Sequence, residues 1–437
     1  MKNTYSEMKD SDVAWIGMIP IHWGLISNKY VMRKQKIICS NWQGENIMSL
    51  TKAGVIIRDI SNPFGKMPET FDGYQYVDSD DLLMCLFDID VTPRCVGRVF
   101  DNGITSPAYS RFKLSSGASL NYYYYYYLML DNEKTLLHLA KNLRHSFTEE
   151  QLGQLKVPYP PLPEQAAIAA YLDEKCGTID EIIAEAKASI EKYKAWKSSV
   201  IFEAVTKGLD PHAEMKDSGV EWIGKVPRHW DVVSLKRLYD YTHGAAVRVG
   251  PFGSALASGD IMADGIWVYN QRTVLDNNFM FNDTCVSEEK AEQLSSFRVY
   301  PGDILITTRG SIGKIAIVPS YAPQGILHPC IIRFRVNEDR LNKKLLRYIF
   351  NDTDMVKKQI LYYSNSTTID VLYSYTLKEI KIPLIPLDEQ QQIIDSLDEK
   401  CAAIDGLIAE KEALIADMEA YKKSLIFETV TGKRKVC

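Results

Sequence analysis

Two long stretches of the chain carry apolar residues at alternating spacings of three and four. The first runs from Pro161 to Lys207, and the second runs from Pro386 to Gly432. This spacing places the apolar side chains on one stripe of a helix, as in the seam of a coiled coil. We therefore predict two long helices, and the predicted seam contains Leu172, Ile179, Ile183, Ile190, Leu397, Ile404, Ile408 and Ile415.

The two stretches are copies of one another. At an offset of 225 residues, Glu164 aligns with Glu389 and Thr206 aligns with Thr431 without a gap, and 23 of the 43 positions are identical. A repeat on this scale must be recognised before the fold is interpreted. At about 1.5 Å per residue, each helix should be roughly 65 Å long.

A second repeat precedes each helix at a distance. Glu7–Trp23 and Glu214–Trp230 match at an offset of 207, and Trp15 matches Trp222 within them. We call these stretches the tryptophan segments. The chain therefore has the order segment, domain, helix, twice over, which is a pseudo-two-fold arrangement. The predicted boundaries are 1–160 for the first domain, 161–208 for the first helix, 209–385 for the second domain and 386–437 for the second helix.

The two domains are less alike than the helices, but they align at an offset near 222. Arg111-Phe112 then matches Arg333-Phe334, and Pro107 matches Pro329. Short fragments of alternating apolar and polar residues between Gly and Pro predict strands in a mixed α/β (α+β) domain. The two domains should share a skeleton and differ in surface.

The run Tyr122–Tyr127 is ambiguous by propensity, because tyrosine favours strands. The preceding Leu120-Asn121 aligns with Leu341-Asn342, whose continuation KKLLRYIF is typical of a helix. We predict a helix whose tyrosines serve mainly in packing. Stacking of these rings on bases is the alternative.

Lys197 and Lys422 interrupt the predicted seams at equivalent positions. They could fix the register of the two helices, as a polar seam residue can. Alternatively, their long side chains extend to solvent.

Composition indicates an ordinary globular protein. The chain has 437 residues, of which 46% are hydrophobic and 24% are charged. No segment approaches twenty uncharged apolar residues, and the polar start MKNTYSEMKDSD lacks the apolar core of a signal peptide, so we expect a cytoplasmic protein without a membrane span. The eight cysteines form no CxxC pair, which argues against a zinc site or a disulfide framework.

The formal net charge of −5 argues against nucleic acid as a partner, but the charge is segregated. The range from Arg298 to Arg347 contains nine Lys and Arg residues and three acidic residues, which gives a local net charge of +6. A basic stretch of this kind can bind DNA that the whole chain would repel.

No catalytic motif is present. The sequence contains no GxxxxGK[ST], no GxGxxG that opens a helix after a strand, no HExxH, and no Asn/Asp-Pro-Pro-aromatic tetrapeptide. His22 and His229 are repeat positions beside tryptophans, which favours a structural role. We therefore expect a non-catalytic protein with no cofactor or metal in this chain.

The best candidate for recognition is the loop Thr307–Lys314, which follows a predicted strand. It combines Arg309, Ser311 and Lys314 with two glycines. Arginine can contact guanine edges in a bidentate manner, while Lys and Ser suit phosphates. A solvated hairpin turn is the alternative. Further candidates for contacts with bases or phosphates are Asn270, Arg272 and His328 in the second domain, and Arg94, Arg98 and Tyr109 in the first.

These features together resemble a known family. The helix openings PLPEQ…LDEK…ID at Pro161–Asp180 and PLDEQ…LDEK…ID at Pro386–Asp405, with MKDSGVEWIGKVPRHW between the halves, resemble the specificity subunit of type I restriction-modification systems. The stretches Ile104–Tyr109 and Gly302–Val318 are similar to that family's target recognition domains. The resemblance covers the whole chain.

The resemblance implies two target recognition domains joined by two long antiparallel helices. Each domain would read one half of a bipartite target in double-stranded DNA, and the helices would dock two modification subunits and set the half-site spacing. S-adenosylmethionine would be bound by the modification subunits. ATP and Mg would be used by two restriction subunits. The alternative is a non-catalytic coiled-coil scaffold that binds only proteins.

Overall fold

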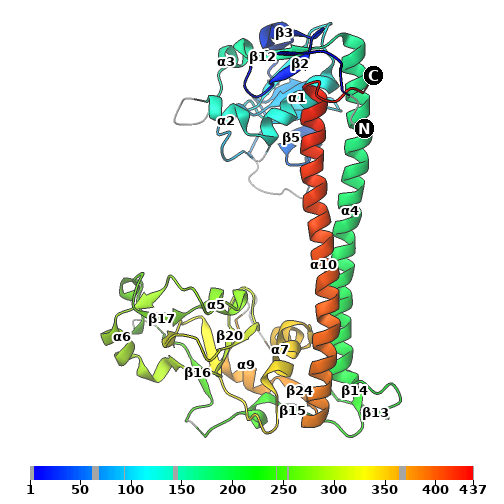
Figure 1. The fold of residues 1–437 in the computed structure, drawn as a ribbon. Helices are drawn as coiled ribbons and strands as arrows, with labels where there is room; N and C mark the ends of the chain where they lie inside the picture. The colour runs from blue at the N-terminus through cyan, green and yellow to red at the C-terminus, as the bar shows by residue number, and fades with distance from the viewer. Residues whose placement is uncertain are drawn as a thin grey trace. The chain divides into compact units, whose positions relative to one another are not determined.

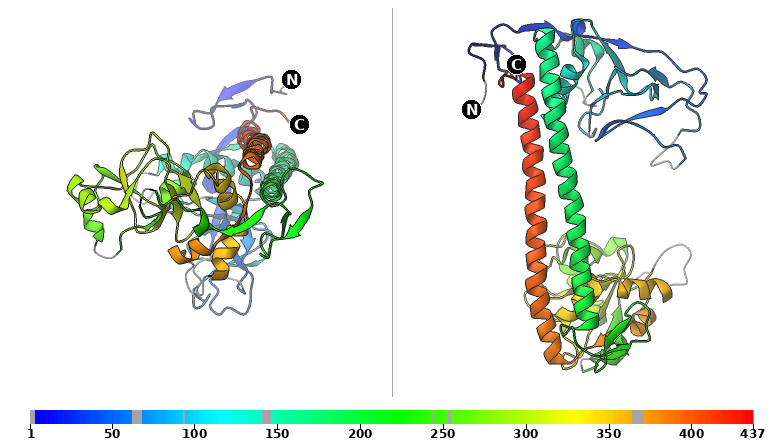
Figure 2. Two further views of the ribbon diagram at one scale, coloured as in Figure 1. Left: turned by 90° about the horizontal axis from the view of Figure 1, so that it is seen from below. Right: turned by 90° about the vertical axis from the view of Figure 1, so that its right-hand side faces the viewer.

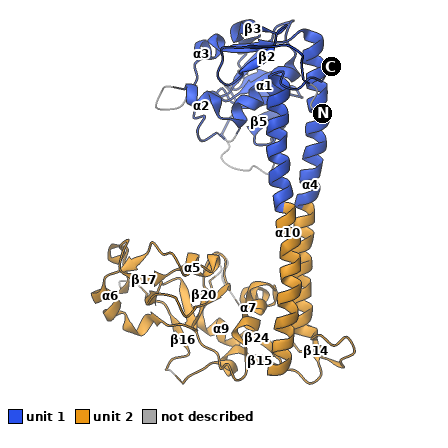
Figure 3. Ribbon diagram, in the orientation of Figure 1, with its two compact units in different colours: residues 1–187, 412–437 blue, residues 188–411 orange. Residues whose placement is uncertain are grey.

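The computed structural model describes residues 4–61, 68–92, 94–140, 146–242, 244–252, 255–363 and 371–436. They form two compact units (Figure 3), which are Met1–Lys187 with Glu412–Cys437, and Ala188–Lys411. Each unit contains one sheet-rich domain and part of each long helix. Among the described residues, no helix is long and apolar enough to cross a membrane.

The two repeated stretches form the predicted long helices (Figure 1): α4 spans Leu162–Lys207 and α10 spans Leu387–Val430. In the first unit, the N-terminal half of α4 shares a hydrophobic core with the C-terminal end of α10. In the second unit, the opposite halves share a core. Within each unit the two helices lie side by side and antiparallel (Figure 2), and the predicted coiled-coil pair is confirmed.

Most of the predicted seam lies between the helices. Ile408 and Ile415 are half-buried. The buried seam residues are Leu172, Ile179, Ile183, Ile190, Leu397 and Ile404.

The two seam lysines form a reciprocal set of ion pairs. In the second unit, Lys197 Nζ lies 2.8 and 2.6 Å from the carboxylate oxygens of Asp405. In the first unit, Lys422 Nζ lies 2.6 Å from both oxygens of Asp180. The two pairs are related by the 225-residue offset. The lysines therefore bridge the helices rather than extend into solvent, and a shift of register would separate both pairs.

The first domain contains two four-stranded sheets. One has the order β4-β11-β8-β9, with bounds Met32–Gln35, Ser110–Leu114, Leu82–Met84 and Val96–Arg98. The other has the order β6-β5-β10-β7, with bounds Gly54–Ile57, Ile47–Thr51, Gly103–Thr105 and Gln75–Val77. In the second sheet β5 and β10 run parallel, with Ile104 opposite Ile47.

The second domain repeats this topology. One sheet has the order β16-β23-β20-β21, with bounds Val247–Val249, Ile331–Phe334, Ile304–Thr307 and Ile315–Ile317. The other has the order β18-β17-β22-β19, with bounds Cys285–Val286, Ile266–Tyr269, Gly325–Leu327 and Arg298–Val299. Again the central pair, β17 and β22, runs parallel. The predicted shared α/β skeleton is confirmed.

Smaller elements complete each domain. The tryptophan segments form the hairpins β1-β2 (Met8–Asp10, Met18–Pro20) and β13-β14 (Met215–Asp217, Lys225–Pro227). A two-stranded ribbon follows each hairpin: β3-β12 (Gly24–Ser27, Lys156–Tyr159) and β15-β24 (Asp231–Ser234, Lys381–Leu384). The first domain has α1 (Leu120–Asn132), α2 (Thr135–Leu139) and α3 (Glu149–Gln154). The second has α5 (Gln271–Asp276), α6 (Glu288–Gln293), α7 (Lys343–Asn351), α8 (Met355–Tyr363) and α9 (Ser374–Glu379).

The tyrosine run lies in α1, as predicted. Its N-cap is Ser119, whose side chain accepts a hydrogen bond from Tyr122 N. Five of the six tyrosines are buried, and Tyr124 is half-buried. Burial of these rings raises the pKa of Tyr126 and its buried neighbours well above the usual value. Their role is packing, and the alternative of a base-stacking surface is wrong for the buried rings.

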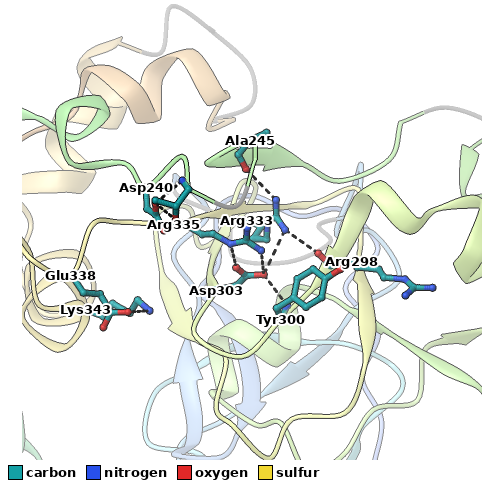
Figure 4. A network of polar contacts seen from close by, with 10 residues as sticks. Asp240, Ala245, Arg298, Tyr300, Asp303, Arg333, Arg335, Glu338 and Lys343 are labelled. Atoms are coloured by element: carbon teal, nitrogen blue, oxygen red, sulfur yellow. Dashed lines mark hydrogen bonds and ion pairs between the residues drawn. The ribbon is translucent and has the colours of Figure 1, made fainter.

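Each domain buries an aspartate–arginine ion pair between matching strands. In the first, Asp81 Oδ2 lies 2.5 Å from Arg111 Nε, and both side chains are almost fully buried. In the second, Asp303 lies 3.6 Å from Arg333 and 2.5 Å from Arg335 (Figure 4). Removal of one partner from such a pair is strongly destabilising, because the other charge is left buried. The pair therefore locks the register of β8 with β11 and of β20 with β23.

The groups around this pair differ between the domains. Asp78 contacts Arg111 and also lies 3.3 Å from Lys113 Nζ. At the matching position the second domain has Tyr300, whose ring centroid lies 5.6 Å from the guanidinium of Arg335. The common frame is thus retained while the charges beside it change.

Each tryptophan segment is tied to the first turn of a long helix. The indole N–H of the buried Trp23 donates to Glu164 Oε2 at 2.8 Å, His22 Nε2 lies 2.6 Å from Oε1, and the Tyr5 hydroxyl donates at 3.0 Å. Burial alone would raise the pKa of Glu164, but these hydrogen bonds outweigh it, and the pKa is below the usual value. A charged carboxylate therefore anchors the segment.

The second unit repeats these contacts between the tryptophan segment and the first turn of the long helix. Trp230 Nε1 donates to Glu389 Oε2 at 2.9 Å, and His229 Nε2 lies 2.7 Å from Oε1. The expected structural role of the two histidines is confirmed. The next helix residue also repeats its contacts: Gln165 accepts from Ser119 N at 2.8 Å, and Gln390 accepts from Asn342 N at 2.7 Å.

We predict that Glu164→Ala destabilises the first unit by about 1–3 kcal/mol, because the buried indole N–H of Trp23 is left without an acceptor. Urea unfolding followed by tryptophan fluorescence measures the loss. The matched control is Glu181→Ala on the exposed face of α4, which should change stability by less than about 0.5 kcal/mol. An equal loss in both variants would contradict the assignment.

The effect of Glu164→Ala should depend on pH. A carboxylate with a lowered folded pKa contributes its stability above its unfolded pKa of about 4.3, and that contribution disappears as the pH falls through the folded value. The wild type and the variant should therefore converge in acid.

Candidate nucleic-acid interface

Several polar side chains of the second domain gather where its strands end. Strands β17 and β22 are parallel, so Asn270 and His328 follow them at the same edge, and His328 N donates to Tyr269 O at 3.1 Å. Strand β20 ends beside them, because Thr308 Oγ1 donates to Cys330 O at 2.9 Å. We call this the polar edge, and it contains Asn270, Gln271, Arg272, Thr308, Arg309, Ser311 and His328.

The loop that carries Arg309 is held by its own backbone. Gly310 and Gly313 adopt φ values of 61° and 78°, which other residues rarely adopt. Thr307 Oγ1 donates to Ser311 O at 2.5 Å and accepts from Lys314 N at 3.1 Å. This turn leaves the side chains of Arg309 and Ser311 exposed.

Gln271 ties the loop to the neighbouring strand end. Its Nε2 donates to the carbonyl of Arg309 at 2.9 Å. A Cβ at Gly310 would lie 3.4 Å from the same nitrogen, so the contact is close. The backbone that carries the Arg309 side chain is therefore fixed from outside the loop as well as from within.

Lys314 leaves the loop on the side of α7. Its ammonium donates to the carbonyl of Asn351, and the side chain of Asn351 bonds both backbone groups of Ile315 at 2.8 Å. The half-buried Lys314 is thus engaged within the domain, and the exposed candidates of the loop are Arg309 and Ser311. This structural use has no signal in the sequence, because Asn351 lies 37 residues away.

Asn270 and Arg272 differ in accessibility. Asn270 caps α5 by accepting from Thr273 N at 3.2 Å, and its amide also donates to Thr284 Oγ1. The Arg272 side chain is 71% exposed, with contacts of 3.4 Å to Asp276 and 3.9 Å to Asp283. Of the pair, Arg272 has the freer side chain.

His328 is half-buried, and burial lowers its pKa below the usual value. Its Nδ1 accepts from Cys330 N at 3.1 Å. In the neutral ring the proton then lies on Nε2, which can donate to an acceptor such as a base edge.

The first domain does not gather its candidates in one place. Tyr109 is half-buried directly before β11, where its carbonyl accepts from Gln75 Nε2 at 2.6 Å, and burial raises its pKa. Arg98 lies 3.0 Å from Asp173 of α4, with its guanidinium 4.6 Å from the Tyr124 ring centroid. Arg94 donates to the Tyr124 hydroxyl at 3.4 Å. The two arginines therefore lie against α1.

One segment beside the polar edge escaped the sequence analysis. Val371 forms an antiparallel bridge with Arg309, and Leu372 N donates to Thr308 O at 2.9 Å. The exposed Tyr373 and Tyr375 follow. The only sequence signal was the i, i+2 spacing of the tyrosines, which does not indicate a partner. Among the described residues, no group of three or more potential metal ligands is gathered.

Comparison with known proteins gives a consistent picture. A model of the type I restriction modification DNA specificity domain matches residues 86–192 and 253–415, more than half of the chain. The type I restriction enzyme MjaVIII specificity subunit of Methanocaldococcus jannaschii is 28% identical over 289 residues, which is 64% of this chain and 63% of that protein. The type I restriction enzyme EcoBI specificity subunit of Escherichia coli is 23% identical over 284 residues, 63% of this chain and 58% of that protein.

These matches span less than two thirds of the relatives' own length. A solved structure from a study of complex assembly and conformational transition of the type I R-M system has a TM-score of 0.68 to this chain at 15% identity. The match covers 94% of this chain and 98% of that one. This likeness supports the same fold, with two sheet-rich domains joined by two long antiparallel helices.

We predict that Gln271→Ala loosens the Arg309 loop without unfolding the domain, because the loop keeps its internal hydrogen bonds and loses only the outer one. Hydrogen exchange of peptides covering residues 308–313 should become about tenfold faster, as expected for a loss near 1.4 kcal/mol. The control Gln293→Ala alters an exposed residue of α6 and should leave this exchange unchanged. Equal exchange in all three proteins would show that Gln271 does not hold the loop.

Proposed function

The chain belongs to the family of type I restriction-modification specificity subunits, and from this premise we propose that its second domain reads one half of a split DNA target with the polar edge. The observation that carries the proposal is the fixed loop that presents Arg309 beside Arg272 and His328. A guanidinium on a fixed backbone can reach a guanine edge in the major groove with two hydrogen bonds. The exposed Arg272, next to the Gln271 that holds the loop, adds positive charge that attracts phosphates.

The first domain reads the other half-site in this proposal. Its skeleton matches that of the second domain, but the glycine loop with Arg309 has no counterpart in its sequence. Two copies of one frame with unlike edges suit two unlike half-sites. Tyr109 is the sequence candidate nearest the matching strand end, whereas Arg94 and Arg98 are engaged with α1 and α4.

The helices dock two modification subunits in this proposal. The repeat gives each unit an equivalent helix pair, including the Lys197–Asp405 and Lys422–Asp180 ion pairs. Two copies of one partner need two equivalent surfaces. The modification subunits bind S-adenosylmethionine and methylate adenine, and two restriction subunits contribute ATP- and Mg-dependent work. This chain supplies recognition without catalysis, in line with the absence of catalytic motifs from its sequence.

The test is to co-express the chain with its modification subunit in a host without adenine methylation and to map N6-methyladenine across the genome. One split motif with a fixed gap supports the proposal. A well-formed complex that leaves DNA unmethylated and unbound would favour the protein-only scaffold.

Arg309→Ala should relax the motif at one position of a single half-site, because one bidentate contact is worth about 1–3 kcal/mol of discrimination. The control Arg237→Ala removes an exposed arginine of the short 3-10 helix Leu235–Leu238 and should leave the motif unchanged.

A second prediction concerns the gap. Deletion of residues 185–191 and 410–416 removes one equivalent heptad from each helix and keeps both the seam and the two lysine–aspartate pairs in phase. Seven helical residues are about 10 Å long, which corresponds to roughly three base pairs at about 3.4 Å each. The methylated motif should therefore keep its half-sites and lose about three positions from its gap. An unchanged gap would show that the helices do not set the spacing.

A further inference from the structure

The segment Val371–Tyr375 runs beside the Arg309 loop. Residues directly opposite one another in an antiparallel pair point to the same face, and successive residues alternate. Val371 lies opposite Arg309, while Leu372 points inward and is only 2% exposed. Tyr373 therefore continues the face on which Arg309 lies.

Tyr373 and Tyr375 form a pre-arranged ring pair. Their centroids are 5.3 Å apart and their planes differ by 8°, so the rings are stacked. The residues are 51% and 62% exposed, and among the described residues neither hydroxyl has a hydrogen-bond partner. The start of α9 holds them, because Leu377 N donates to Tyr373 O at 3.1 Å and Leu377 is fully buried.

Such a pair suits binding for two reasons. A tyrosine has few rotatable bonds, so ordering it on binding costs little entropy, and stacking reduces that cost further. Its hydroxyl can donate to a phosphate oxygen while its ring covers the apolar face of a sugar. Contacts of this kind position a protein on DNA without reading sequence.

On the basis of the proposed function, we propose that Tyr373 and Tyr375 contact the sugar-phosphate backbone of duplex DNA beside the base read by Arg309. The hydroxyls donate to phosphate oxygens, and the stacked rings lie against deoxyribose. The Tyr pair then fixes the position of the duplex, while Arg309 reads it. The exposed charges beside the tyrosines favour DNA over an apolar protein surface, because Arg309 shares their face and the 71% exposed Arg272 follows Gln271, whose amide donates to the Arg309 carbonyl.

The experiment uses the complex of the full chain with its modification subunit and two duplexes, one with the mapped target and one without it. The double variant Tyr373→Phe/Tyr375→Phe retains both rings and removes only the hydroxyls. Fluorescence anisotropy should show about a tenfold loss of affinity for each duplex, the sum of two modest hydrogen bonds. The ratio of the two affinities should stay constant. The slope of affinity against salt should also stay constant, because no charge is removed.

The matched control is Tyr321→Phe. Tyr321 is 63% exposed and precedes β22, at the opposite end of that strand from His328, so its variant should bind both duplexes like the wild type. The variant Tyr373→Ala/Tyr375→Ala removes the rings as well and should lose more affinity than the Phe variant. Thermal unfolding verifies that each variant is folded.

Three results would overturn the inference. Unchanged affinity in both double variants shows that the pair does not touch DNA. Failure of the variants to assemble with the modification subunit identifies the pair as a protein contact. A changed base preference in the half-site identifies it as a reader. Failure of the proposed function is separate, because the wild-type complex would then show no preference between the two duplexes.

Discussion

The hydrogen bond from a buried tryptophan to a glutamate in the first turn of a long helix is the contact on which each unit depends. An indole N–H that is removed from water must find an acceptor, and Glu164 and Glu389 provide it for Trp23 and Trp230. Since the glutamate belongs to the helix and the indole belongs to the tryptophan segment, this bond sets where the domain meets the helix. The chain contains this contact twice, with nearly the same distance between the indole nitrogen and the carboxylate oxygen.

Beyond this repeated contact, the two domains share their buried ion pairs and differ in the residues around them. The buried pairs of Asp81 with Arg111 and of Asp303 with Arg333 hold the same sheet in both domains. Around these pairs the two domains carry different residues, as Asp78 and Tyr300 at matching positions illustrate. A fold of this kind can vary its strand ends without altering its core, which suits the proposed reading of two different half-sites.

At the polar edge, the side chain proposed to read DNA projects from a fixed backbone. Arg309 is exposed, but its carbonyl and the turn that carries it are held by Gln271 and Thr307. A side chain on a fixed backbone loses less freedom on binding than one on a mobile loop. Lys314 helps to hold the other end of the loop, because its ammonium donates to the carbonyl of Asn351.

The long helices, the repeats and the helical tyrosine run could be predicted from the sequence alone, because heptad spacing and internal alignment are local or periodic signals. The sequence also showed that Arg309 and Ser311 share a glycine loop. Which polar side chains remain accessible could not be predicted and became clear from the folded chain. Arg98 bonds Asp173, 75 residues away, and Asn270 caps α5. Val371, two residues before Tyr373, pairs with Arg309. A side chain's partners are set by the packing of segments that are distant in sequence, and no spacing along the chain encodes that packing.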